Sequence, residues 1–223
     1  MSGGIKKRAG AYHHGNLRSA LLGAAVKVVE QDGVSALTLR TLASRAGVSS
    51  GAPYHHFESR EQLLAAIAAE GLAGLVSEMR RCNAAVTDPD AKLEALGRGY
   101  VRYALAHRGH FRVMFRPELR GLLGKEINKV LGEGLVLLRE AIVNCQSAGF
   151  APAGDTNGLV LLAWAAVHGA CQLWIDGPLA HEGLVADEEA LGSTVAGTLV
   201  NLMTNNGARA PLAPLPDATT CCT

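Results

Sequence analysis

Apolar residues recur at steps of three and four along most of the chain, which is the period of a helix with one buried face. In the first such segment Leu17, Leu21 and Val28 fall on one face. Asp32 and Gly33 follow, and a glycine directly after an apolar run is typical of a left-handed helix cap. The pattern therefore predicts a first helix that ends at about residue 32.

Two short helices are predicted between residues 38 and 57. Thr38 is placed to cap the first, which runs to about Arg45, and a tight turn around Gly47 follows. Ser49 or Ser50 is predicted to cap the second, which reaches residue 56. Pro53 lies inside this helix and has no N–H to donate, so the helix is expected to start late or to be kinked. Two short helices joined by a three-residue turn fit a helix-turn-helix.

Five longer apolar periodicities follow. They predict helices over residues 60–81, with Ser59 as the cap, and over 89–104, 127–148, 158–175 and 187–204. Residues 107–124 contain three glycines and a proline, which predicts one or two short helices there. His107 and His110 are interpreted as a solvated helix end. Aromatic residues make up only 4% of the chain, which argues against a β-sandwich. The predicted fold class is all-α.

The charge is distributed unevenly. Residues 1–60 hold eight Lys and Arg against three Asp and Glu, a charge of +5, whereas the remainder holds thirteen against seventeen, a charge of −4. A basic first quarter on an acidic body indicates a polyanion as partner, although an incidental solvated face would give the same count. We therefore predict a DNA-binding head over 1–60 with a basic N-terminal arm, a helical body over 61–206 and a disordered tail over 207–223. The arm, with Lys6, Lys7, Arg8, His13 and His14, either follows DNA or is disordered.

Residues 158–175 are apolar and almost long enough to cross a membrane. His168 and Gln172 interrupt them, and Asp155 and Asp176 bracket them, so we interpret the segment as a buried helix. The first residues carry no apolar core of a signal peptide. The five cysteines are scattered without a CxxC pair, which favours a reducing compartment. A cytoplasmic protein without a membrane segment is expected.

The chain contains none of the motifs GxGxxG, GxxxxGK[ST] or HExxH. No pair of His, Cys or Asp residues shows metal-ligand spacing together with a second such pair elsewhere in the chain. We therefore predict that the protein is not an enzyme and uses neither a cofactor nor a metal. A helical enzyme or small-molecule carrier without a DNA-binding role is the alternative, and a membrane-associated helical protein is a third interpretation.

Residues 15–64 resemble the N-terminal DNA-binding domain of the TetR (tetracycline repressor) family of transcriptional regulators. The resemblance rests on Asp32-Gly33, on the run from Leu37 to Ser49, LTLRTLASRAGVS, and on Tyr54, His56-Phe57 and Arg60. Pro53 departs from the family, which more often has an apolar residue such as Leu there. The family's roles imply phosphate contacts for Tyr54, His56 and Arg60, a place beside the groove for Thr38 and Arg40, and base contacts for Ser50, Gly51 and His55. Ser49 supplies a further hydroxyl near the start of the groove helix, and Arg40 could reach a guanine edge.

A second, shorter resemblance covers residues 158–177. Trp164, His168, Gly169 and Trp174 resemble the W-H-G signature of one subgroup of TetR C-terminal domains. Trp164 and His168 are four residues apart and share one helical face. His168 is interpreted either as a buried histidine with one hydrogen bond or as a polar group in a ligand cavity.

The resemblance implies a body that binds a small-molecule effector and forms a homodimer. Aromatic and thioether side chains from three segments are predicted to line the effector cavity, which would suit an apolar or aromatic molecule. The alternative is that they fill an ordinary core. The predicted lining residues are Tyr100, Tyr103, Phe111, Met114, Phe115, Trp164, His168 and Trp174.

The last two long helices are apolar over most of their surface, and the family dimerises through this pair. We expect a two-fold dimer with Val160, Val167, Val195, Leu199 and Leu202 among its contacts. The expected function is a ligand-responsive homodimeric repressor that grips double-stranded operator DNA and is released by its effector.

Overall fold

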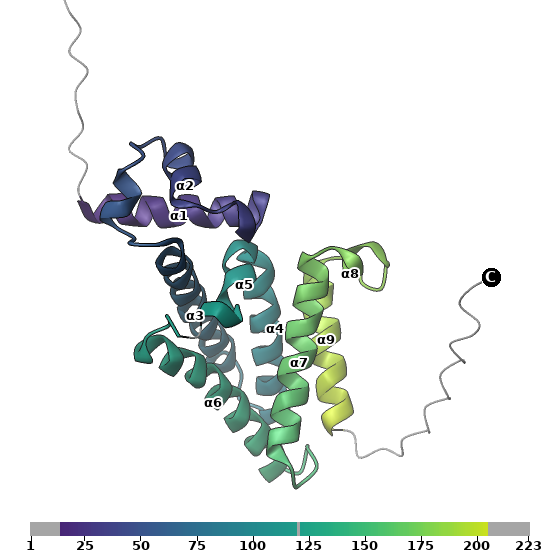
Figure 1. Ribbon diagram of the computed structural model, residues 1–223. Coiled ribbons are helices and arrows are strands. Elements are labelled where there is room, and N and C mark those ends of the chain that lie inside the picture. The colour runs from purple at the N-terminus through teal and green to yellow at the C-terminus, as the bar shows by residue number, and fades with distance from the viewer. Residues whose placement is uncertain (1–13, 120, 205–223) are drawn as a thin grey trace, which may run out of the picture.

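The computed structural model describes residues 14–119 and 121–204 of the chain (Figure 1). The predicted arm around Lys6-Lys7-Arg8 and the predicted tail 207–223 lie outside these residues. Every regular element in the described part is helical, which confirms the all-α fold class. The head contains α1 (His14–Asp32), η1 (Val34–Ala36), α2 (Leu39–Ala46) and η2 (Ala52–His55). The body contains α3 (Arg60–Ala84), α4 (Pro89–Ala106), α5 (Arg108–Met114), η3 (Pro117–Leu119), α6 (Lys125–Ser147), α7 (Thr156–Ile175), α8 (Pro178–His181) and α9 (Glu188–Thr204).

Local signals set the start of α2 and α3. The Thr38 hydroxyl accepts a hydrogen bond from the Thr41 N–H, and the Thr41 hydroxyl accepts one from the Thr38 N–H. The two bonds form a reciprocal capping box. The Ser59 hydroxyl likewise accepts from the Gln62 N–H at the start of α3. Gly47 ends α2 with a φ of 66°, a left-handed conformation that suits glycine. These helix boundaries agree with the predictions.

The second helix of the predicted helix-turn-helix is shorter than expected. It is a 3₁₀ turn, η2, whose N-cap is Gly51, so neither Ser49 nor Ser50 caps it. In this turn the Tyr54 N–H donates to the Gly51 carbonyl, and the His56 N–H donates to the Pro53 carbonyl. Both hydrogen bonds join residues three positions apart. Proline disfavours the α conformation in the residue before it, so no α-helix starts ahead of Pro53. Too few residues remain before the buried Phe57 for an α-helix to develop.

The body is a helical bundle. α3 packs on α4, α5 and α6, while α7 and α9 pack on α4 and on one another at one side of the bundle (Figure 1). The sequence analysis missed α8, a single turn that follows Gly177 at a φ of 100°. Pro178 occupies its first helical position, where the missing N–H has no intrahelical partner to lose.

The head rests on the body where α1 crosses α5 (Figure 1). A Cβ atom added to Gly109 would lie 2.7 Å from the Val26 carbonyl oxygen, so the two helices approach as closely as a glycine permits. Arg112 joins the same junction. Its guanidinium donates to the Glu30 carbonyl at the end of α1 (3.0 Å) and to the Ile175 carbonyl at the end of α7 (3.2 Å).

The interpretation of His107 and His110 as a solvated helix end is wrong for His110. Its side chain is buried because α5 lies against both α1 and α3, and neither ring nitrogen has a hydrogen-bond partner among residues 14–119 and 121–204. Glu70 Oε1 lies 3.6 Å from Nε2. Burial lowers the pKa of His110, so its neutral form is favoured. His107 is exposed and packs its ring on Tyr103, with 4.3 Å between the ring centroids.

Two helices in the described part are long and apolar enough to cross a membrane. The most apolar window of α3 is 56% buried inside the protein, which is typical of a core helix. The window in α7 is only 28% buried. This helix therefore presents an apolar face that the rest of the described chain does not cover.

Candidate nucleic-acid interface and effector cavity

The head presents an exposed polar surface on α2, on η2 and on the turn between them. These two elements pack on one another, so their outward side chains share one region of the head. The predicted DNA-contact residues that are exposed there are Thr38, Arg40, Ser49, Ser50, Gly51, Tyr54 and His55, and His56 is half-buried. Tyr54 is 58% exposed, unusually open for a ring of its size, and its ring is free to meet another molecule.

The exposed residues differ in how far they are already engaged. The Thr38 hydroxyl is used in the capping box. Arg45 forms an ion pair with Asp32 at 2.5 Å. Arg40 has neither a hydrogen bond nor an ion pair to any residue in 14–119 or 121–204, so its guanidinium is available to an external anion or base edge.

Arg60, predicted to contact phosphate, is used differently. Its Nε donates to the Leu37 carbonyl oxygen (2.7 Å), and its Nη2 donates to the Val34 carbonyl oxygen (2.8 Å). The side chain is partly buried between α3 and the η1 segment. Its position at the start of α3 follows from the Ser59 cap, but bonds to residues 23 and 26 positions earlier cannot be seen in a sequence pattern. These bonds give Arg60 a structural role in holding the head on α3, and its phosphate contact stays a prediction.

Arg60→Ala is therefore expected to destabilise the protein by about 2–3 kcal/mol, because two carbonyl oxygens lose a charged donor. Arg60→Lys should recover only part of this, since an ammonium cannot reproduce the forked geometry. Denaturant unfolding of the purified protein measures the effect. A variant as stable as the wild type, whose DNA affinity alone has fallen, would return Arg60 to the phosphate contacts.

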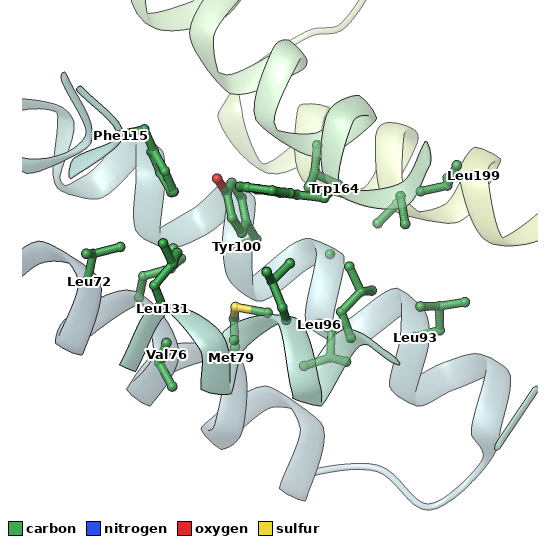
Figure 2. A pocket seen from close by; sticks show the side chains of 18 of the residues that line it. Leu72, Val76, Met79, Leu93, Leu96, Tyr100, Phe115, Leu131, Trp164 and Leu199 are labelled. Atoms are coloured by element: carbon green, nitrogen blue, oxygen red, sulfur yellow. The ribbon is translucent and has the colours of Figure 1, made fainter. Parts of the chain in front are cut away.

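An apolar cavity lies between α3, α4, α6, α7 and α9, with about 50 Å³ of room for water-sized molecules. Figure 2 shows the rings of Tyr100, Phe115 and Trp164 along one side, with the aliphatic side chains of Leu72, Val76 and Met79 across from them. The other lining residues are Leu75, Leu93, Leu96, Gly97, Leu131, Gly134, Leu135, Leu138, Ala163, Val167, Ala196, Leu199 and Val200. We call this space the apolar cavity.

Two polar groups meet beside the apolar cavity. The Tyr100 hydroxyl lies 2.9 Å from His168 Nδ1, within hydrogen-bond distance. Burial raises the pKa of Tyr100 and lowers the pKa of His168, so both side chains are neutral at pH 7. A neutral imidazole accepts the tyrosine O–H at one nitrogen and keeps a donor at the other. The pair therefore adds a polar group to the wall without adding a charge.

The structure brings some of the predicted cavity residues together and separates others. Tyr100, Phe115 and Trp164 line the apolar cavity, and Met114 and His168 line its opening. Phe111 is buried in the core against the ring of Tyr100, and Tyr103 points at Gly74 of α3. Trp174 lies further along α7 and lines neither space. Most of the lining is aliphatic, and the sequence gives no signal that separates a cavity leucine from a core leucine.

The predicted dimer contacts also divide. Val160 and Val167 are buried within the single chain, and Val167 lines the apolar cavity, so neither offers much surface to a second copy, and the dimer stays a prediction. Leu199 is half-buried on the same inner side. Leu202 is 74% exposed. Leu161, Leu162 and Leu173 on α7 are also exposed, which the sequence analysis did not single out.

Comparisons with known proteins give a consistent result for both parts of the chain. Residues 21–67 match the model of bacterial regulatory proteins of the tetR family. Residues 93–198 match the model of a tetracyclin repressor-like C-terminal domain. The two matches cover the head with the start of α3 and most of the body. The likeness of residues 158–177 to the W-H-G subgroup stays a prediction.

The chain is 32% identical over 133 residues to the HTH-type transcriptional repressor KstR2 of Rhodococcus jostii. The aligned residues make up 59% of this chain and 64% of that protein. The alignment thus spans less than two thirds of this relative. A solved protein of unknown function from Rhodococcus sp. RHA1 is 31% identical with a TM-score of 0.72, covering 88% of this chain and 100% of that one. The TetR-family regulator PfmR of Thermus thermophilus, 21% identical with a TM-score of 0.69 over 81% of this chain and 97% of its own, has the same fold.

Proposed function

The chain belongs to the TetR family of bacterial regulatory proteins, and from this premise we propose that it is a homodimeric transcriptional repressor released from operator DNA by a small apolar effector. The observation that carries the proposal is the pairing of an exposed helix-turn-helix head with a body that encloses an apolar cavity. The comparisons favour a regulator over a helical enzyme or carrier. Such a repressor acts in the cytoplasm, where the DNA is.

In this proposal the head places η2 and the preceding turn in the major groove. Arg40 is free to reach a guanine edge, and the hydroxyl groups of Ser49 and Ser50 face the bases. Tyr54 and His56 position the head on the phosphate backbone. A symmetric dimer presents two such heads, so the operator has two half-sites about one helical turn, roughly 34 Å, apart.

The exposed face of α7 supports a dimer. Leu162, Gly169 and Leu173 fall on one face of α7, and Leu202 extends the apolar surface on α9, beside it. A Cβ on Gly169 would meet no atom of the protomer within 4 Å, so the space above this glycine is open to a partner helix. Two such helix pairs facing each other across a two-fold axis would bury the exposed leucines.

The apolar cavity supports an effector without a charge at its buried end, because its only polar lining comes from neutral groups. α7 lines the cavity and also supplies the dimer face, so a molecule between α3 and α7 would alter the spacing of the two heads. Because coupling is reciprocal, operator DNA would weaken effector binding by the same factor as the effector weakens DNA binding.

The full-length protein should select a palindromic duplex from random DNA and bind it at low salt. Fluorescence anisotropy with the selected duplex then gives the affinity and its salt dependence. Apolar compounds that quench or shift the fluorescence of Trp164 should release the duplex. A protein that enriches no sequence and binds DNA with the same affinity as an unrelated acidic protein would disprove the proposal.

Arg40→Ala is expected to weaken binding to the selected duplex by roughly 5- to 150-fold for each half-site, the value of one good base contact, because the proposed dimer carries one Arg40 per half-site. It should also relax the preference at one base pair of each half-site. Arg45→Ala is the matched control on the same helix, because Arg45 is paired with Asp32, and it should change the affinity less than about threefold. Equal losses for both variants would show that only the overall charge of the head matters.

A further inference from the structure

Two further hollows lie near the apolar cavity. The adjoining one, which we call the mouth, is lined by Met114, Arg116, Leu123, Asn128, Leu161, Ala165 and His168 together with three residues of the cavity wall. Those three shared residues are Phe115, Leu131 and Trp164. A third hollow lies where the head meets the body, and its walls are Val34, Ser35, Arg60, Arg112, Arg116, Gln172 and Asp176. We call it the arginine groove; Arg116 lines both the mouth and this groove.

Helix α7 runs beside all three spaces. Trp164 lines the apolar cavity and the mouth, His168 lines the mouth, and Gln172 and Asp176 line the arginine groove. These residues are four positions apart and lie on one face of the helix. The row spans roughly 18 Å at 1.5 Å per residue. Along it the lining changes from hydrocarbon to imidazole, then to amide and charged groups, so the route from cavity to groove grows steadily more polar.

The arginine groove carries excess positive charge. Arg60 and Arg112 donate to backbone carbonyl oxygens, and neither forms an ion pair with a carboxylate in the described part of the chain. Arg116 pairs with Glu118 at 2.5 Å, and Gln172 donates to the Asp176 carboxylate at 2.5 Å. Asp176 is thus the one carboxylate lining the groove against three guanidinium groups. Guanidinium groups bind carboxylate and phosphate through charge-assisted hydrogen bonds.

We propose that the effector is an elongated amphipathic molecule whose apolar chain fills the cavity and whose oxyanion end, a carboxylate or a phosphate, binds in the arginine groove. The inference rests on the proposed function, because it names the chemistry of that function's effector. The shared lining residues place the apolar cavity, the mouth and the arginine groove next to one another in order of increasing polarity. An end group with negative charge completes the ion pairs that Arg60 and Arg112 lack.

The same site explains how such an effector reaches the head. Arg112 ties the end of α1 to the end of α7, and Arg60 ties η1 and Leu37 to α3. An oxyanion in the groove competes with these carbonyl oxygens for the same N–H donors. Because a charged acceptor forms the stronger hydrogen bond, it draws the guanidinium groups away from the head. Binding of the anion thereby loosens the contacts that hold the head in position.

Three probes with the same chain test the end group: dodecyl phosphate and dodecanoate below their micelle concentrations, and dodecanol below its solubility limit. Calorimetry on the full-length protein should give at least tenfold tighter binding for the two anions than for dodecanol. The order of the two anions tells whether a phosphate or a carboxylate fits the groove better. Arg116→Gln should weaken binding of both anions about tenfold and leave dodecanol within twofold.

Arg116 suits this test because its carboxylate partner, Glu118, lies two residues away, so the substitution breaks no ion pair between helices in the described part of the chain. Arg98→Gln is the matched control: Arg98 is also a half-exposed arginine with one carboxylate partner, Glu94, but it lies outside the mouth and the groove. It should leave all three affinities unchanged. Thermal melting verifies that both variants are folded.

Three results would overturn the inference: dodecanol binding as tightly as the anions, Arg116→Gln weakening all three probes equally, or none of the three probes binding. Operator binding without any probe is measured in parallel. A wild-type protein that binds its operator but shows no preference for the anions refutes the amphipathic effector alone. A wild-type protein that binds no operator refutes the proposed function.

Discussion

Replacing Leu162 and Leu202 together by glutamate is expected to give a monomer whose operator affinity is at least roughly 100-fold lower. Both leucines are exposed in the protomer, at 52% and 74%, and both lie on the pair of helices proposed to meet a second copy. In a two-fold interface each new carboxylate lies near carboxylates of the second copy. Burying a carboxylate there without a cationic partner is costly. A monomer engages one half-site at a time and so loses the gain from linked binding.

Light scattering gives the mass of the variant in solution, and anisotropy with the operator gives its affinity. Leu122 and Val136 are similarly exposed but lie outside α7 and α9, so the double change Leu122→Glu with Val136→Glu is the matched control and should remain a dimer. If Leu162→Glu with Leu202→Glu also remains a dimer at micromolar concentration, the interface lies elsewhere on the protein.

Gly109→Ala is expected to destabilise the protein by about 1–3 kcal/mol and lower Tm by roughly 2–12 °C. The new methyl group would lie 2.7 Å from the Val26 carbonyl oxygen, a backbone atom that can move only if α1 shifts against α5. Because α1 carries the head, the shift should also change operator affinity in the absence of any effector. Calorimetric melting and anisotropy measure the two effects.

Gly132→Ala is the control for the ordinary effect of removing a helical glycine. Gly132 lies within α6, and a Cβ there would meet nothing within 4 Å. Alanine should therefore stabilise this helix by about 0.5–1 kcal/mol. A Gly109→Ala variant that gains stability like Gly132→Ala would show that the head is not held against α5 in solution.

The sequence predicted the long helices well because their limits depend on neighbouring residues. Thr38 and Ser59 cap helices through bonds to residues three positions on, and Pro89 starts α4 at a position that tolerates its missing N–H. Such short-range chemistry is visible in any stretch of ten residues. The prediction from such signals was wrong at η2. The effect of Pro53 on the preceding residue shortens this helix more than the capping signals of Ser49 and Ser50 indicated.

The site was harder to predict because it depends on contacts between distant residues. α7 is apolar on nearly every face, so the sequence could not tell that Val167 points inward while Leu162 points outward. Arg112 bonds to carbonyl groups 82 and 63 residues away, and any arginine of the body was an equal candidate for that role. A cavity is a gap between helices, and no residue type marks its walls.

The hydrocarbon lining also determines which property of a bound molecule sets its affinity. Walls formed by Leu72, Leu96, Leu135 and similar side chains contribute about 0.8 kcal/mol for each methylene they cover, or roughly a fourfold change in affinity. Three added carbons are worth roughly fifty-fold, until the chain outgrows the space and affinity falls. In the proposed function, such a lining makes the affinity depend on the length of the effector. The protein is expected to answer to a graded series of homologues, with one preferred size, and not to a single compound.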